Sequence, residues 1–488
     1  MTDKNTISRR KFVTTSIGTS SAVGLAFLGY RRAFAQSVLQ KKAELPYPVD
    51  FKPTPNKLLD LPAGFHLNAF SRVGEKMDDG LYVPGKHDGM GAFLAPDGNT
   101  ILIRNHELNA EDKEISAFGW NDEKLTSSLR ERLYDPGSGV LPSLGGTTTL
   151  IYDTHQQELK GHFLSLAGTL RNCAGGKTPW HTWISCEETV QRAVSPYEMD
   201  HGYPFEVPAT SAMSLVAPLP LKEMGRFNRE AVAIDPHSGC VYQTEDRWDA
   251  LFYRFVPNQP RALQRGGKLQ ALKIRGIEGV DTSNWRTPKH IVLPWTYKPI
   301  PVGDKLAVEW VDLENVTSPA DDLRQQGYQE RGAARFARSE GLWYGAVDNS
   351  STGHVYIACT LGGRNYKGQI WQYTPSPYEG TAREDSSPGS LQLFVEPNDS
   401  KLLEGADNLT VAPWGDLIVC EDGGGEQYLV GITPEGQLYR FARNAGNTSE
   451  FAGATFSPDG TTLFVNVQNP GITLAITGDW TRARELAV

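Results

Sequence analysis

The chain repeats one pattern of apolar and polar positions: two apolar segments joined by a short turn and closed by a polar end. Residues 92–105 (AFLAPDGNTILIRN) and 454–467 (ATFSPDGTTLFVNV) show it best, with Pro-Asp-Gly between two apolar runs. Short runs rich in β-branched and aromatic residues, bounded by turn residues, predict the strands of an antiparallel hairpin. Six such units occur: 88–107, 168–188, 230–246, 340–360, 407–422 and 453–469.

Further apolar segments follow several of these hairpins, at residues 251–256, 369–373, and 428–432 with 436–441. Four strands per unit, repeated radially, predict an all-β fold, a six-bladed β-propeller with loop and short helical insertions. A sandwich of two sheets is the alternative, which the matching polar ends of six hairpins disfavour. The insertions expected as loops on one face are 111–142, 195–220 and 276–332.

Composition agrees with a strand-rich globular protein. The 488 residues include 49 Gly and 31 Pro, which favour turns, and the aromatic content of 10% suits strands. This length allows two or three ordinary domains or one large repeat-built domain. We expect a signal peptide at residues 1–35, an extended lead-in at 36–60 and a single propeller domain at 61–488.

The N-terminus has the features of a twin-arginine signal peptide. Ser8-Arg9-Arg10-Lys11-Phe12 is followed by a weakly apolar run and by Ala33-Phe34-Ala35, an A-x-A cleavage pattern. A membrane anchor is the alternative, but Ser, Thr and Gly dilute the apolar run. We therefore expect export by the twin-arginine machinery to the periplasm or beyond, a route that carries folded proteins and so suits one that contains a cofactor.

The balance of charge excludes some partners. The formal net charge of −9 becomes more negative once residues 1–35 are removed, because they hold six Lys or Arg and one Asp. An acidic surface of this kind disfavours nucleic acid and stable association with anionic membranes. The excess of carboxylates could instead hold cations.

Hairpin geometry brings several of these carboxylates together. The first residue of one strand and the last residue of its partner lie at the same open end of a hairpin. If the innermost strands start on one face, the opening residues Asp88, Glu230, Glu340 and Asp407 gather around the central channel. A ring of carboxylates suits hard cations, although each acid taken alone is better explained as a solvated cap of a strand.

The unit at residues 168–188 (GTLRNCAGGKTPWHTWISCEE) adds sulfur to this ring. It carries Cys173 and Cys186 at opposite ends of one hairpin, with Glu187 and Glu188 directly after the second. A disulfide between the two cysteines is one interpretation, although five cysteines cannot all pair within the chain. The other is a thiolate ligand, which biases one metal position toward a transition metal.

One arginine lies close to the predicted ring. Arg338 is two residues before Glu340 in RFARSEG, and a guanidinium beside bound metals can hold a phosphate by paired, charge-assisted hydrogen bonds. A salt bridge to a neighbouring acid explains it equally well.

Four segments together resemble the PhoX-type alkaline phosphatase family: GTLRNCAGGKTPWHTWISCEE, GRFNREAVAIDPHSGCVYQTEDR, DNLTVAPWGDLIVCEDG and FSPDGTTLFVNVQNPG. The resemblance implies a twin-arginine-exported β-propeller that hydrolyses phosphomonoesters with oxo-bridged Fe³⁺ and with Ca²⁺. It further implies Cys173 and Glu230 as iron ligands, and Arg338 as the group that binds substrate phosphate. Glu188, Glu340 and Asp407 would be carboxylate ligands, mainly to calcium, with Glu187 against Glu188 and Asp407 against Asp422 left open.

The chain departs from the family in two respects. It is shorter than many members, and Ser165 stands near the place of a lysine that assists phosphate binding in the family. We therefore expect a monomeric, periplasmic, metal-dependent phosphomonoesterase acting on small phosphorylated substrates. The alternatives are a calcium-dependent propeller hydrolase of another ester, such as a lactonase or phosphodiesterase, and a non-catalytic propeller that binds a partner.

Overall fold

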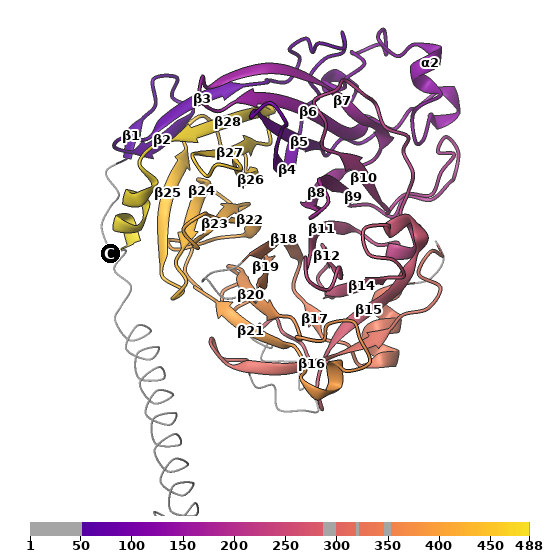
Figure 1. Ribbon diagram of the computed structural model, residues 1–488, viewed down its shortest axis with the longest axis vertical. Coiled ribbons are helices and arrows are strands. Elements are labelled where there is room, and N and C mark those ends of the chain that lie inside the picture. The colour runs from indigo at the N-terminus through magenta and orange to yellow at the C-terminus, as the bar shows by residue number, and fades with distance from the viewer. Residues whose placement is uncertain (1–50, 286–298, 319–321, 346–352, 488) are drawn as a thin grey trace, which may run out of the picture. The chain divides into compact units, whose positions relative to one another are not determined.

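The computed structural model describes residues 51–285, 299–318, 322–345 and 353–487 (Figure 1). The chain divides into two units, Met1–Pro48 and Val49–Val488, and the second contains every described residue. The predicted signal peptide at 1–35 and the first part of the lead-in, 36–50, lie outside the described residues.

Strands are the main regular secondary structure of the second unit and form antiparallel sheets. One sheet has the order β4 (His87–Leu94), β5 (Thr100–His106), β6 (Gly145–Asp153), β7 (Glu158–Thr169). A three-stranded sheet consists of β8 (Asn172–Lys177), β9 (Thr182–Glu187) and β10 (Pro204–Pro208). A four-stranded sheet has the order β26 (Phe451–Phe456), β27 (Thr462–Val467), β28 (Ile472–Thr477), β3 (His66–Phe70).

Two sheets are larger. A six-stranded sheet has the order β22 (Ala406–Val411), β23 (Leu417–Glu421), β24 (Tyr428–Ile432), β25 (Leu438–Asn444), β2 (Leu59–Pro62), β1 (Phe51–Pro53). A nine-stranded sheet starts with β11 (Arg229–Ile234), β12 (Val241–Glu245), β14 (Tyr253–Pro257), β15 (Gly267–Ile274) and β16 (Lys305–Asp312). It continues with β21 (Ser390–Val395), β20 (Gln369–Thr374), β19 (His354–Cys359) and β18 (Ser339–Gly345). A separate pair is formed by β13 (Ala250–Leu251) and β17 (Arg335–Phe336).

Helices among the described residues are few and short. They are α2 (Ser127–Arg130), the π-helical turn η5 (Gln325–Glu330), and the 3₁₀ turns η1 (Lys113–Ile115), η2 (Gly137–Gly139), η3 (Lys222–Met224), η4 (Leu263–Arg265), η6 (Glu384–Ser386) and η7 (Trp480–Ala487). Among the described residues, no helix has the length and apolar character needed to span a membrane.

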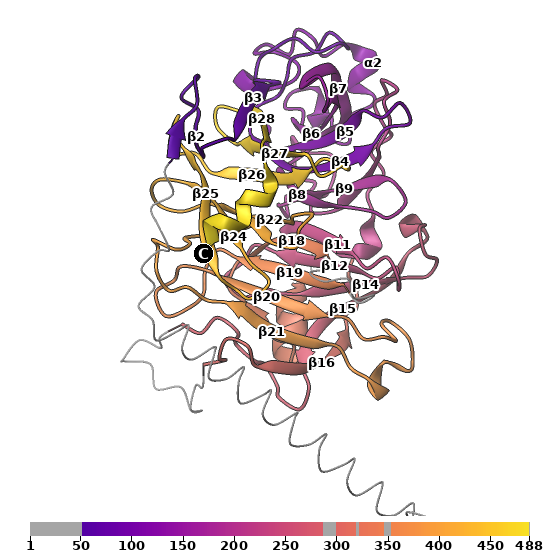
Figure 2. The ribbon, with the colours of Figure 1, turned by 60° about the vertical axis from the view of Figure 1, so that its left-hand side comes forward.

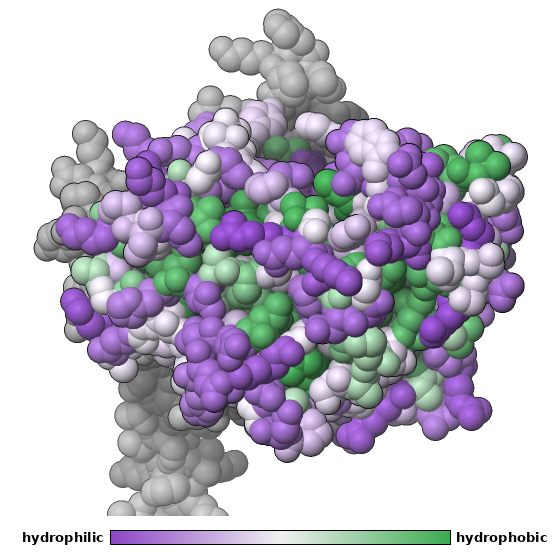
Figure 3. Space-filling model, turned by 90° about the horizontal axis from the view of Figure 1, so that it is seen from above, coloured by the Kyte–Doolittle hydropathy of each residue, from purple (hydrophilic) through white to green (hydrophobic). Residues whose placement is uncertain are grey.

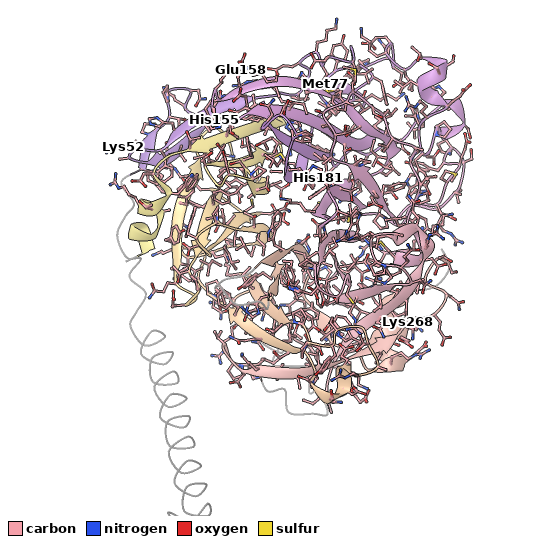
Figure 4. The ribbon with its side chains drawn as sticks, in the orientation of Figure 1. Lys52, Met77, His155, Glu158, His181 and Lys268 are labelled. Carbon is pink, nitrogen blue, oxygen red and sulfur yellow. The ribbon has the colours of Figure 1, made fainter. Side chains whose placement is uncertain are left out.

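The sheets are arranged around a common centre, and the predicted all-β propeller arrangement is confirmed (Figure 1). Strand β4 contacts β8, β8 contacts β11, β11 contacts β18, β18 contacts β22, β22 contacts β26, and β26 contacts β4 again. These strands surround the centre, and in the turned view they lie between the outer strands (Figure 2). In Figure 4, His181 at the β8–β9 turn lies near the centre, whereas Glu158 of β7 and Lys268 of β15 lie at the periphery.

An early and a late strand of the described chain meet in one sheet. Strand β3 pairs antiparallel with β28, from Phe70 opposite Thr473 to His66 opposite Thr477. The last sheet is therefore completed by an early strand, which links both ends of the ring by hydrogen bonds. Strands β1 and β2, at the end of the predicted lead-in, extend another sheet outward by pairing with β25.

Pro-Asp-Gly turns join the innermost strands as the sequence predicts. Between β4 and β5, Gly98 has φ +89°, which glycine adopts without strain, and Asp97 Oδ1 accepts from the amide of Asn99. The turn from β26 to β27 repeats this arrangement at Asp459 and Gly460, the latter with φ +71°. The repeated motif therefore fixes the hairpin ends opposite the predicted ring of acids.

Two predicted loop insertions contain strands, so that part of the prediction is wrong. Segment 195–220 contributes β10, and segment 276–332 contributes β16, which pairs with both β15 and β21. In β16, Leu306, Val308 and Trp310 pack on the apolar core at alternate positions. This alternation buries one face of the strand, whereas insertion 111–142 contains only short helical turns and loops.

The core lies between the sheets. Large side chains that are less than 2% exposed include Trp183, Trp371 and Tyr242, and apolar residues of facing sheets pack around them. The surface seen from above is mostly hydrophilic, with hydrophobic side chains in scattered groups (Figure 3). This distribution is that of an ordinary protein in water.

Candidate metal centre

Each innermost hairpin carries a register shift near one end, typical of a β-bulge. The shifts lie between His87 and Met90, Asn172 and Gly175, Arg229 and Val232, Ser339 and Leu342, Ala406 and Leu409, and Ala452 and Thr455. The residues that directly follow the first member of each pair are Asp88, Cys173, Glu230, Glu340, Asp407 and Gly453. A bulge bends its strand and redirects a side chain, and five of these six positions hold a metal-ligating residue type.

These side chains form a continuous cluster. Four groups each have ligand atoms within 4.8 Å of one another: Asp88, Glu107 and Cys173; Cys173, Glu188 and Glu230; Glu230, Glu340 and Asp407; Asp407, Asp422 and Glu450. Each group shares a residue with the next, so the acids and the thiol follow one another through the centre. We call these nine residues the central cluster.

Small residues beside the bulges let the innermost strands approach one another. A Cβ on Gly89 would lie 2.5 Å from the Cα of Ala174, and one on Gly341 would lie 2.4 Å from the carbonyl oxygen of Asp407. Such contacts are too close for any side chain. Glycine at these two positions therefore permits the spacing that brings ligand atoms of neighbouring sheets together.

Burial and mutual repulsion make the ionised carboxylates unfavourable here. Burial, together with the neighbouring acids, raises the pKa of Glu188 to about 8 and that of Asp407 to about 7. The same causes raise the pKa values of four more acids, Asp88, Glu230, Glu340 and Glu450, well above their ordinary range. A bound cation removes this penalty, since it offsets the repulsion and replaces lost hydration.

Cys173 and Glu230 face each other at the centre of the cluster. The Cys173 thiol donates to Glu230 Oε1 at 3.0 Å, and burial and the nearby acids raise the pKa of this thiol well above its usual value. Glu230 is 1% exposed, and its Oε2 is buried with no hydrogen-bond partner among the described residues. A buried carboxylate oxygen without a partner is costly, and a metal ion held jointly with the sulfur would satisfy it.

Two arginines contact the cluster. Arg171 Nη2 lies 2.7 Å from Glu107 Oε1 and is also ion-paired with Glu188. Arg338 forms a two-pronged pair with Asp246, with Nε to Oδ1 and Nη2 to Oδ2 both at 2.7 Å, and its Nη2 lies 3.1 Å from Glu340 Oε1. The salt bridge proposed as an alternative for Arg338 is therefore present, at the edge of the cluster.

Glu187 and Glu188 have different surroundings. Glu187 accepts hydrogen bonds from His201 Nδ1 at 2.6 Å, from the amide of Leu170 at 2.9 Å and from the amide of Gly202 at 2.8 Å. The alternation of side chains at the end of β9 turns Glu188 the other way, into the central cluster. The geometry thus favours Glu188 as a ligand, whereas Asp407 and Asp422 both belong to the cluster.

Cys173 and Cys186, the two cysteines of the hairpin at 168–188, also lie in different surroundings. All five cysteines are buried free thiols, and Cys186 packs in the apolar core with Ile184 and Leu221. Ser165, which the family resemblance placed near a phosphate-binding lysine, is buried in β7 and hydrogen-bonds with the hydroxyl of Thr147 at 2.8 Å.

Sequence reasoning missed Glu450. The sixth bulge holds Gly453, which has no side chain, and Glu450 directly precedes β26 to reach Asp407 and Asp422 instead. Glu107 and Asp422 close their hairpins in the sequence and could be found by the rule that both open ends of a hairpin meet. For Glu450, the available signal was an acid three residues before Gly453, where the sixth unit begins.

Comparison with known proteins identifies the family. The family model described as alkaline phosphatase PhoX matches residues 48–159 and 151–471, which is most of the chain. The chain belongs to the PhoX alkaline phosphatase family. It is accordingly a metal-dependent phosphoric monoester hydrolase that releases inorganic phosphate from organic phosphates.

Solved structures resemble this PhoX-family chain to different degrees. Pseudomonas fluorescens PhoX in complex with vanadate, a transition state analogue, aligns with a TM-score of 0.61 at 17% identity, covering 88% of this chain and 97% of that one. A gluconolactonase from Xanthomonas campestris has a TM-score of 0.36 at 11% identity, covering 89% of this chain and 99% of its own. The Cps50 propeller domain of Myceliophteria thermophila has a TM-score of 0.40 at 9% identity, covering 85% and 100%. None of the curated protein sequences compared with the chain matches it.

Proposed function

We propose that phosphomonoester hydrolysis takes place at the central cluster, with Fe³⁺ and Ca²⁺ as the resident metals. The observation that carries this proposal is the contact of Cys173 with Glu230, whose second carboxylate oxygen has no partner among the described residues. A site rich in carboxylates suits Ca²⁺, and the addition of one thiolate suits iron at one position. The donor set therefore fits the metals that the family resemblance implies.

We assign the two metals to different residues of the central cluster. Cys173 and Glu230 would hold iron, while Glu188, Glu340 and Asp407 would hold mainly calcium. Asp88, Glu107, Asp422 and Glu450 supply further carboxylate oxygens within the same overlapping groups. When bound, the metals supply Lewis-acid polarisation of the phosphoryl oxygens.

Arg338 is the residue that we assign to the substrate phosphate. Its side chain is 33% exposed and lies between Asp246 and Glu340, so it borders both solvent and the cluster. A guanidinium can donate charge-assisted hydrogen bonds to phosphate oxygens and stabilise the charge that develops on them. Its pair with Asp246 fixes the direction of the side chain before substrate arrives. Vanadate bound to the Pseudomonas fluorescens relative supports a site for phosphate-like oxyanions in this fold.

We also propose that the fold has six blades. The innermost strands β4, β8, β11, β18, β22 and β26 are each the first strand of one blade, and they contact one another in a closed ring. On this count the nine-stranded sheet is two blades, β11-β12-β14-β15 and β18-β19-β20-β21, joined at their outer edges by β16.

Export by the twin-arginine route, a periplasmic location and a monomeric state remain proposals, supported by the N-terminal sequence and the acidic charge.

Metal analysis combined with phosphate release tests the proposal. The purified, exported protein should contain iron and calcium and release phosphate from ribose 5-phosphate. Glu340→Ala should lose metal and activity together, and Arg338→Ala should keep the metal but raise KM about 10- to 100-fold through loss of charge-assisted hydrogen bonds. Glu314→Ala, which removes an exposed acid paired with Arg331, is the control and should change neither.

Three results would count against these assignments. Iron and calcium bound without phosphate release would contradict the activity, whereas calcium without iron would contradict the role of Cys173. An active Glu340→Ala protein with unchanged metal content would move the site elsewhere.

A further inference from the structure

Three aromatic side chains form an exposed group beside Arg338. Trp248 is 63% exposed and Tyr366 is 46% exposed, while Trp285 is half-buried between them. The ring centroids of Trp248 and Trp285 are 5.5 Å apart, and those of Trp285 and Tyr366 are 5.8 Å apart. Large exposed aromatic groups are uncommon on a surface that is otherwise hydrophilic, and they mark binding sites more often than single exposed residues do.

Hydrogen bonds connect the loops that carry these rings to Arg338. The amide of Arg338 donates to the carbonyl of Arg247, the residue directly before Trp248, at 2.9 Å. The Arg338 side chain donates to Asp246, which is two residues before Trp248. The amide of Thr360 in turn donates to the carbonyl of Arg338 at 3.1 Å. The two residues from Asp246 to Trp248 span at most about 7 Å, so the backbone of Trp248 lies close to the Arg338 guanidinium.

The loops of Tyr366 and Trp285 are tied to the same place. The amide of Gly363 donates to the carbonyl of Ser283 at 2.7 Å, which joins the two aromatic loops just after Thr360. Thr360 itself donates its hydroxyl to Glu340 Oε1 at 2.8 Å, a member of the central cluster. The aromatic group is therefore part of the rim of the candidate metal centre.

Three residues of these loops have left-handed backbone conformations. Arg338, Asn284 and Tyr366 have φ values of +52°, +54° and +56°, in the left-handed region that residues other than glycine seldom adopt. Such conformations persist where the surrounding structure holds them, and they gather at ligand sites. In this rim they hold the phosphate-binding arginine and one of the three rings.

We infer that Trp248, Trp285 and Tyr366 bind the base of a nucleoside 5′-monophosphate whose phosphate is held at Arg338. This inference rests on the proposed function of the metal centre. In such a substrate the ribose separates phosphate from base, which matches a charged group and a ring platform on one rim. An aromatic face stacks on any base, so the site distinguishes nucleotides from sugar phosphates rather than one base from another.

Kinetics with two matched substrates test this assignment. AMP and ribose 5-phosphate share a phosphorylated pentose and differ in the base, so their ratio of kcat/KM isolates the contribution of stacking. For Trp248→Ala, we expect kcat/KM for AMP to fall about 10-fold, mainly through KM, because stacking of one base contributes about 1–3 kcal/mol. The value for ribose 5-phosphate should stay within twofold, and Trp248→Phe should restore most of the effect on AMP.

A control variant and a second measurement make the outcome decisive. Trp120 is 58% exposed in the insertion between β5 and β6, so Trp120→Ala removes an equally exposed ring and should leave both substrates unchanged. Adenosine, which has no phosphate, should quench tryptophan fluorescence of the wild type and not of Trp248→Ala.

Different failures have different meanings. If ribose 5-phosphate is not hydrolysed by the wild type, the proposed function fails. If it is hydrolysed but Trp248→Ala leaves the AMP ratio unchanged, the inference about the base is overturned. A shift of Trp248→Ala from dimer to monomer in size-exclusion chromatography, with the AMP ratio unchanged, would assign the rings to contact with a second copy of the chain and also overturn it.

Discussion

Glu187 and Glu188 are adjacent in sequence, and their side chains are 0% and 11% exposed, yet their environments are opposite. Glu187 has hydrogen-bond donors for both carboxylate oxygens, supplied by His201 and by backbone amides. The His201 network, formed by Glu187, His201 and Asp135, is completed by Asp135 Oδ2 at 3.2 Å from His201 Nε2. Glu188 instead meets other acids, and burial with the repulsion of Glu107 raises its pKa to about 8 despite the nearby Arg171.

This comparison shows that burial alone does not identify a metal ligand. What distinguishes the two glutamates is whether the chain itself supplies the groups that balance a buried charge. In the His201 network it does, so that network needs no ion. In the central cluster the described residues supply two arginines, which make three ion pairs, for eight acids and a thiol, so the remaining charge requires a cation.

The same substitution at two glutamates should therefore have opposite effects, and the larger one is expected at Glu230. Glu230→Gln removes one charge from the central cluster, so the protein should lose metal and its kcat should fall by about 1,000-fold, or about 4 kcal/mol. The metal-free variant should be no less stable than the metal-free wild type, because a neutral amide avoids the cost of a buried carboxylate. Elemental analysis, phosphate release and urea unfolding check these points.

Full metal content in Glu230→Gln would remove the proposed distinction between the two environments. A metal-free variant much less stable than the metal-free wild type would show that Glu230 is structural in the way that Glu187 is.

Glu187→Gln should give the reverse result. The amide leaves the buried His201 with Asp135 as its sole acidic partner, so the free energy of unfolding should fall by about 3 kcal/mol. Metal content per folded molecule and KM should stay unchanged, because Glu187 is not among the groups of the central cluster. Unfolding in urea measures the first quantity, and elemental analysis of the folded fraction measures the second. Loss of metal without loss of stability would show that Glu187 is a metal ligand rather than a structural residue, in the way expected for Glu230.

The repeated hairpins could be predicted because their turns and apolar alternation are local properties of the sequence. The rule that hairpin ends meet also predicted that Glu230, Glu340 and Asp407 come together, as they do in one group of the central cluster. Strand β16 could not be recognised as a link between sheets, because its partners β15 and β21 lie far apart in sequence. Nor could sequence separate Glu187 from Glu188, because the donors to Glu187 include His201 and Gly202, which only the fold brings to that carboxylate.

The smallest expected effect is a pH dependence that belongs to the His201 network. Burial lowers the pKa of His201, but Glu187 and Asp135 outweigh burial and raise this pKa to about 9. Because the pKa in the folded protein exceeds the value of about 6.5 in the unfolded chain, the stabilisation is fully present below pH 6.5 and is lost as the pH rises through 9. Between pH 7 and pH 9 the metal-loaded wild type should lose about 2 kcal/mol of stability from this group.

His201→Gln should lack this component, so the stability difference between the two proteins, measured by urea unfolding, should narrow as the pH rises. A difference that stays constant from pH 7 to pH 9 would mean that His201 is neutral, and that Glu187 is balanced by hydrogen bonds rather than by charge.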